Sequence, residues 1–223
     1  RCSNSFRSCS AVASLSVVTL DVGDVIVVEP AGIVLNSVLT ANGAFSVTAA
    51  GDIAANHLES LTDAEDNDIR LTSTIGDILI DLIRAGRSNG EIYLVAGREI
   101  REVDLYDPDV DVTAQHASIS VQGEFGSSLN PELNLELDVS RFSFSGRELV
   151  GDFSGDIVLN VSASGIINVK ATGTISVEHM VSGGGEITLT AGEDILIGYA
   201  DAGAQNGVVI LTGSGSIYEL EPA

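Results

Sequence analysis

Two short acidic runs carry the residue types that bind hard cations. Calcium is held by about six to eight converging oxygens, and carboxylates at alternate positions supply them in calcium-binding loops. The first run, residues 63–68, lacks the glycine at the sixth position of an EF-hand loop. The second run, residues 107–111, lacks both that glycine and a closing glutamate. The sequence therefore leaves calcium binding and a solvated turn both open. The candidate ligands are Asp63, Glu65, Asp66 and Asp68 in the first run and Asp107, Asp109 and Asp111 in the second.

The histidines offer no recognisable catalytic or zinc motif. His57, His116 and His179 lie in different segments, without an accompanying cysteine or acid motif. Zinc and catalytic sites both require several ligating or reacting groups in a defined arrangement. The sequence also contains no Gly-x-Ser-x-Gly elbow, phosphate-binding loop or dinucleotide fingerprint. We therefore predict no enzyme activity, no catalytic residue and no cofactor.

Both cysteines lie within the first ten residues. Their spacing, with six residues between them and no second pair, does not fit the closely spaced ligand pairs of a zinc site. In an oxidising compartment the two thiols could pair with each other or with a neighbouring subunit, and free thiols are the alternative. Cys2 and Cys9 are thus disulfide candidates in a short N-terminal segment, residues 1–10.

Most of the chain consists of short segments in which apolar and polar side chains alternate. Each segment follows a glycine, often with an acid next to it, as after Gly51 and Gly185. After Gly185, the residues Ile187, Leu189 and Ala191 fall on one side of an extended chain and polar residues fall on the other. This period of two predicts half-buried β-strands. No stretch shows a sustained helical period with caps, so we expect almost no helix.

The alternating segments also repeat at longer range. Residues 68–80 match 186–197 at an offset of about 117, and residues 43–53 match 165–175 at an offset of 122. We therefore expect one β-solenoid, residues 1–223, built from two tandem units of about 120 residues. The expected units are approximately 1–104 and 105–223.

A finer spacing predicts the architecture. Ile69 and Ile92 are 23 residues apart, and Ile187 and Val209 are 22 residues apart. A repeat of this length is typical of one coil of a parallel β-helix, so we predict an all-β fold with about 20–25 residues per coil and about nine or ten coils. The chain has no Trp and only 4% aromatic residues, which suits a narrow aliphatic core. We expect the alternation to point Phe45, Phe142 and Phe144 inward.

The repeats resemble those of a known group of bacterial proteins. Residues 185–195 have the pattern G-[DE]-I-x-L-T-A-G-x-D-I, and residues 90–100, 109–114 and 126–131 follow the same style. They resemble filamentous-haemagglutinin-type exoproteins and giant tandem-repeat bacterial surface proteins, over roughly residues 43–220. This resemblance implies a secreted, right-handed β-helical shaft that serves in adhesion or as a surface fibre.

The charge balance restricts the partners. The formal net charge is −22, from 32 acidic and 10 basic residues. Nucleic acids and anionic membranes require a basic face, so neither is an expected partner. No stretch approaches the roughly 20 apolar residues of a membrane span. On a solenoid, the acids after the corner glycines would face outward and discourage lateral association.

These observations predict a structural extracellular protein. We expect the β-helical shaft of a bacterial surface fibre, filament or adhesin, located at the cell surface, with a possible cell-surface or matrix ligand. Segments 11–29 and 215–221 are strand-like without an evident cap, so we expect either head-to-tail self-association through the terminal coils or a slice of a longer shaft. The alternative is a carbohydrate-active β-helix enzyme, a polysaccharide lyase or hydrolase, which would need clustered acids and aromatic platforms on one face.

Overall fold

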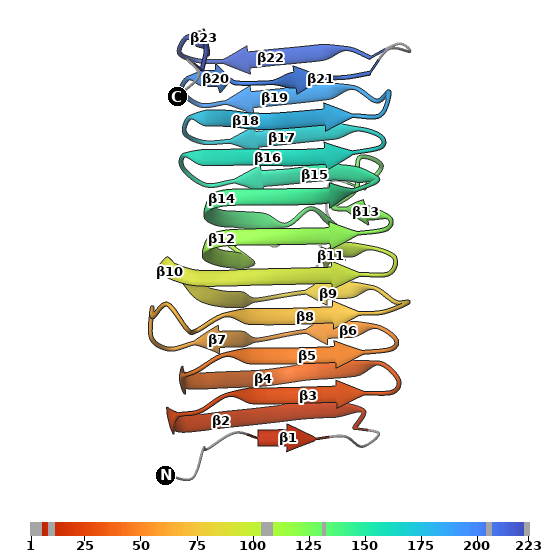
Figure 1. Cartoon of the computed structure of the whole chain (residues 1–223), viewed down its shortest axis with the longest axis vertical. Helices are drawn as coiled ribbons and strands as arrows, with labels where there is room; N and C mark the ends of the chain where they lie inside the picture. The colour runs from red at the N-terminus through yellow and green to blue at the C-terminus, as the bar shows by residue number, and fades with distance from the viewer. Residues whose placement is uncertain (1–5, 9–11, 104–108, 131–132, 204–206, 221–223) are drawn as a thin grey trace.

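The chain winds into coils that stack along one axis, as a computed structural model shows (Figure 1). The structure describes residues 6–8, 12–103, 109–130, 133–203 and 207–220. Within these residues the fold is all-β without an α-helix, and parallel strands form a β-solenoid of about nine turns. The predicted parallel β-solenoid is therefore confirmed.

The strands pair in parallel ladders along the axis, each strand with the equivalent strand one coil away. Ladder A contains β1 (Phe6–Ser8), β3 (Val25–Glu29), β5 (Phe45–Ala49), β8 (Ile69–Ser73), the later parts of β10 (Ile83–Ala96), β12 (Val112–Val121) and β14 (Glu136–Gly146), then β16 (Ile157–Ala163), β18 (Ile175–Ser182), β20 (Ile195–Ile197), β21 (Ala200–Asp201) and β23 (Ile217–Glu219).

Two further ladders complete the cross-section. Ladder B contains the start of β4 (Ile33–Asn42), β6 (Ile53–Ala55), β9 (Ile78–Ile80), β11 (Ile100–Glu102), β13 (Glu124–Phe125), β15 (Glu148–Phe153), β17 (Ile167–Ala171), β19 (Ile187–Ala191) and β22 (Val209–Gly213). Ladder C contains most of β2 (Ser14–Val22), the end of β4, β7 (Leu58–Ser60) and the early parts of β10, β12 and β14.

The core is built as the alternating pattern predicts. In β5, Phe45, Val47 and Ala49 are buried, while Ser46 and Thr48 face outward. The same in-and-out pattern recurs in the strands above and below, so isoleucine, valine and leucine stack in register along the interior. Burying these side chains supplies the main stabilising term of a solenoid, since each coil contacts only its neighbours.

The glycine–acid corners have a structural role beyond solubility. The carboxylate of Asp52 accepts the backbone N–H of Asp77 in the next coil at 2.9 Å, and Asp156 accepts that of Thr174 at 2.8 Å. Asp24, Asp77, Asp111 and Asp194 make the equivalent bond to the next coil. A Cβ on Gly76 would overlap the Asp52 carboxylate, which explains the glycine at that corner.

The coils change in length partway along the axis. In the lower coils, two residues that pair on neighbouring strands of ladder A are separated by a long stretch of sequence, as Ala117 and Phe142 are. The next two pairs are Phe142 with Leu159 and Leu159 with Val177. Each is separated by fewer residues than the predicted coil contains. The reason is that ladders B and C merge: β15 pairs with β13 of ladder B and also with β14 of ladder C. One corner of the cross-section is thereby removed.

Four phenylalanine rings pack together where the ladders merge. Phe125, Phe142, Phe144 and Phe153 are all buried, and Phe142 lies 5.1 Å from Phe153 and 5.6 Å from Phe125, centroid to centroid. Phe45, Phe142 and Phe144 point inward as predicted. Bulky rings therefore gather at one level of an otherwise aliphatic core.

Segments that match in sequence do not occupy the same ladders. Residues 68–80 contain β8 and β9, which belong to ladders A and B. The matching residues 186–197 contain β19 and β20, which belong to ladders B and A. The repeat thus encodes a strand–corner–strand segment that occupies two different positions in the cross-section. The division into units 1–104 and 105–223 stays a prediction.

Candidate functional site

Three acidic residues converge at the corner between ladders B and C. Glu102 ends β11, Asp111 immediately precedes β12, and Glu136 begins β14. One ligand atom from each lies within 4.8 Å of the others. Glu102 and Asp111 are buried, and Glu136 is half-buried. These residues are hereafter called the acidic triad.

The position of Glu102 departs from the pattern of the core. It pairs with Ile80, which pairs with Ala55, and that residue pairs with Leu35. All three are buried apolar side chains at inward positions. The alternation would predict another aliphatic residue here, so a carboxylate at this level is a local exception to the rule that builds the core. Such exceptions often mark functional sites.

Burial dominates the electrostatics of the triad. The pKa of Asp111 is raised to about 8, mainly by loss of solvation and further by the neighbouring carboxylates of Glu102 and Glu136. The opposing influence is the backbone N–H of Glu136, which donates to Asp111 Oδ2 at 2.8 Å. Asp111 therefore holds a proton near neutral pH, which lowers the repulsion among three nearby carboxyl groups.

The second acidic run is only partly represented in this triad. Asp111 is a member, Asp109 is exposed, and Asp107 lies outside the described residues. Glu102 and Glu136 come from strands on either side in the chain, and sequence reasoning missed both. A signal was present, because Ile100-Arg101-Glu102 stands where the preceding coil has Ile78-Leu79-Ile80.

The first acidic run has other contacts. Asp63 accepts the backbone N–H groups of Ser88 and Asn89 at 2.9 and 2.8 Å, and these bonds lower the pKa of Asp63. Asp68 pairs with Arg70 at 2.8 Å. Glu65 and Asp66 are exposed in the turn between β7 and β8. Within the described part of the chain, this run forms no group of three converging ligands, and calcium at either run stays a prediction.

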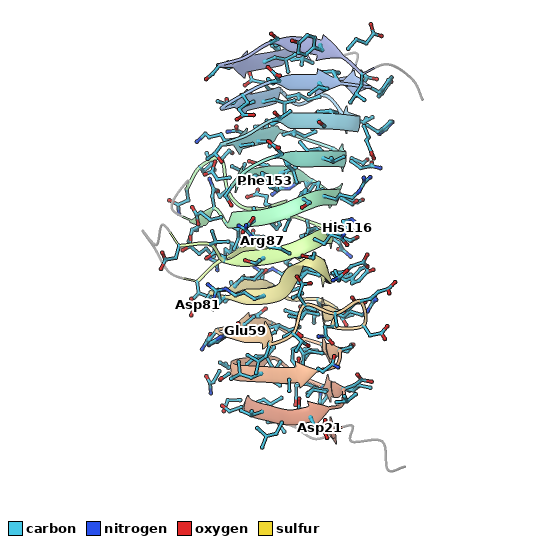
Figure 2. The ribbon with its side chains drawn as sticks, turned by 90° about the vertical axis from the view of Figure 1, so that its left-hand side faces the viewer. Asp21, Glu59, Asp81, Arg87, His116 and Phe153 are labelled. Carbon is cyan, nitrogen blue, oxygen red and sulfur yellow. The ribbon has the colours of Figure 1, made fainter. Side chains whose placement is uncertain are left out.

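The histidines face outward in three different settings. His57 Nε2 lies 3.2 Å from Glu59 Oε2. His179 stacks on Tyr199 with ring centroids 5.0 Å apart. His116, on the outer surface in Figure 2, lies 3.0 Å from the hydroxyl of Ser143. No histidine of the described ranges belongs to a group of three metal ligands. Cys2 and Cys9 lie outside these ranges, so their pairing stays a prediction.

Comparison with known protein families, curated proteins and solved structures finds no match to this chain. None of the described segments forms a helix long and apolar enough to cross a membrane.

Proposed function

We propose that this chain is a structural shaft, the β-helical part of an extracellular fibre, filament or adhesin of a bacterial surface, and that copies stack end to end. Three features support the proposal. The fold is a solenoid of about nine turns, its repeats resemble those of bacterial surface exoproteins, and its formal net charge is −22. An acidic surface keeps a rod of β-strands from associating laterally.

The uppermost coil carries the proposal of end-to-end stacking. Val209 and Ile217 occupy inward positions and pair with Ile187 and Ile195 one coil below. Those lower residues are fully buried, whereas Val209 is 42% and Ile217 is 52% exposed. At the opposite end, Leu15 is only partly buried against the core. Each terminal coil thus presents apolar side chains that a further coil would bury.

The direction of the strands selects the mode of association. All of the described strand pairings are parallel. A second copy can extend parallel ladders only when its first coil lies on the last coil of the first copy. This contact is heterologous and does not close, so it generates a filament.

Sedimentation velocity over micromolar concentrations tests the stacking. We expect the mean size of the sedimenting species to increase with protein concentration. The increase should be larger at high salt, because salt screens the repulsion between acidic copies. Val209→Glu places a charge at an inward edge position and should suppress growth. Ile210→Glu changes the neighbouring outward-facing residue and serves as the matched control. A monodisperse monomer under all these conditions would contradict end-to-end association.

The alternative of a polysaccharide lyase or hydrolase has less support. Such an enzyme needs acids that reach a sugar from a lateral surface. Of the three carboxyl groups that converge, two are buried inside the solenoid wall. Tyr93 and Tyr199, two candidate sugar platforms, have their rings covered by Arg70 and His179.

A further inference from the structure

Three residues of different coils meet on the outer surface of ladder A. Glu91 pairs directly with His116 on the next coil. Ser143 lies one coil further, paired with Ser118, and so is displaced along the strand from the level of His116. All three are partly exposed, and Figure 2 shows His116 at the outer edge of the solenoid.

Their contacts follow the order serine, histidine, acid. His116 Nε2 lies 3.0 Å from Ser143 Oγ, and His116 Nδ1 lies 3.9 Å from Glu91 Oε1. In the tautomer with its proton on Nδ1, toward Glu91, the imidazole accepts the serine proton at Nε2. This order of groups activates a serine hydroxyl for attack on a carbonyl carbon once Glu91 moves from ion-pair distance to hydrogen-bond distance of Nδ1.

A second layer of side chains holds the acid in place. The Tyr93 hydroxyl donates a hydrogen bond to Glu91, which raises the pKa of Tyr93 and so keeps the phenol protonated as a donor. The guanidinium of Arg70 lies over the Tyr93 ring, 3.8 Å from its centroid. Asp68 in turn binds Arg70 at 2.8 Å. Because most of these groups stand on paired strands, the constellation is preorganised.

The developing oxyanion needs a hydrogen-bond donor beside Ser143. The backbone N–H groups of these strands are used in the ladders. Asn160 pairs with Ser143 on the next coil and its side chain is exposed on the same face. One rung is about 4.8 Å, so the Asn160 amide can reach a carbonyl oxygen bound at Ser143. Arg141 is engaged by Glu178 at 2.9 and 3.0 Å.

We propose that Ser143, His116 and Glu91 form a catalytic site that hydrolyses short-chain carboxylic esters, with Asn160 stabilising the oxyanion. The short chain follows from the surroundings, because Ser118, Ser145 and Ser162 line the neighbouring outward positions and offer no apolar acyl pocket. This activity goes beyond the structural role and does not depend on it.

The reaction has two balanced halves. Ser143 Oγ bonds to the carbonyl carbon as its proton passes to His116 Nε2, and the alcohol departs with that proton as its bond to the carbon breaks. Water then attacks the acyl-serine, gives a proton through His116 to Ser143 Oγ, and releases the carboxylic acid. Glu91 stabilises the imidazolium in both halves.

Hydrolysis of p-nitrophenyl acetate by the full chain, with fluorophosphonate labelling read by peptide mass spectrometry, tests the site. We expect label on Ser143. Ser143→Ala and His116→Ala should each lower the rate by about 10²–10⁴-fold, and Glu91→Gln by less. Asn160→Ala should lower kcat with KM nearly unchanged.

Ser46→Ala and His57→Ala are matched controls on outward strand or corner positions away from the site, and both should keep the wild-type rate. Circular dichroism identifies any variant that fails to fold, and the labelling of wild-type protein gives a result independent of the variants. Absence of label, label on another serine, or an unchanged rate in folded Ser143→Ala would overturn the proposal and leave His116–Ser143 as a surface contact.

Discussion

The lower and upper parts of the solenoid use the same strands to build different cross-sections. Up to β14, each coil contributes to three ladders, and one step along ladder A leads from Ala117 to Phe142. From β15 onward, ladders B and C continue as one strand, and the next step is shorter, from Phe142 to Leu159. Side chains alternate between inward and outward positions in both parts. The number of corners, rather than this strand pattern, therefore sets the shape of the cross-section.

The boundary between these two parts needs bulky side chains. Phe142 contacts the rings of Phe125, Phe144 and Phe153, with centroids 5.1 to 6.4 Å apart. In the lower part, Phe45 has the aliphatic ladder neighbours Val25 and Ile69, and no ring contact of Phe45 is found within the described residues. The comparison indicates that aromatic residues fill the space where one cross-section passes into the other.

The largest effect is expected from substitutions at this boundary. Phe142→Ala should lower the free energy of unfolding by about 3–5 kcal/mol, and by more than Phe45→Ala, because lost ring–ring contacts add about 0.5–1.5 kcal/mol per pair. Urea unfolding of both variants measures the difference, with Phe142→Leu and Phe45→Leu as milder controls. Equal losses at the two positions would show that the boundary has no special need for aromatic packing.

A second effect distinguishes the lower part, because only its B–C corner buries the acidic triad. In the unfolded chain Asp111 ionises near pH 4, but its pKa in the folded protein is about 8. The folded state therefore holds an extra proton between these values, and stability falls as the pH rises from about 4 to about 8, by up to about 1.4 kcal/mol per pH unit.

Asp111→Asn tests this dependence while keeping an oxygen that can accept the Glu136 N–H. Unfolding by urea between pH 5 and 8 should show that the variant loses less stability than the wild type as the pH rises. Acids outside the triad titrate equally in both proteins, so the difference isolates Asp111 together with its effect on Glu102 and Glu136. If the two slopes are the same, the triad does not retain a proton.

The corner aspartates should matter to a similar degree in both parts. Asp52→Ala in the lower part and Asp156→Ala in the upper part each remove the acceptor of one backbone N–H of the next coil. We expect each to lower stability by about 0.5–1.5 kcal/mol, measured by thermal or urea unfolding. Asn at either position keeps an acceptor and should recover most of the loss. A large effect in one part only would mean that the corners are not equivalent.

The smallest effect is expected at surface ion pairs. Arg141 and Glu178 are about half exposed and link strands β14 and β18. Arg141→Ala should change the free energy of unfolding by less than about 1 kcal/mol, and less again at high salt. A loss comparable to that of Phe142→Ala would show that the upper part depends on charge rather than on core packing.

Much of the fold could be predicted because its rules are local. Alternation along each strand identified the inward faces, including Phe45 and Phe144, and the glycine–acid pairs marked the corners. The functional candidates were harder, since Glu102, Asp111 and Glu136 come from three strands. Sequence reasoning grouped Asp111 with Asp109, its neighbour in the chain, whereas the fold groups it with Glu102 across the same corner and with Glu136 one coil further on.

The strand period, the aliphatic core and the strand–corner–strand repeat follow from the sequence alone, because they depend on neighbouring residues. The length of each coil, and hence the set of side chains that stack, depends instead on how the corners pack in three dimensions. Glu91 meets His116 because, at that level, Ile92 pairs with Ala117. A shorter coil, like the one below it in which Ile69 pairs with Ile92, would bring different side chains together.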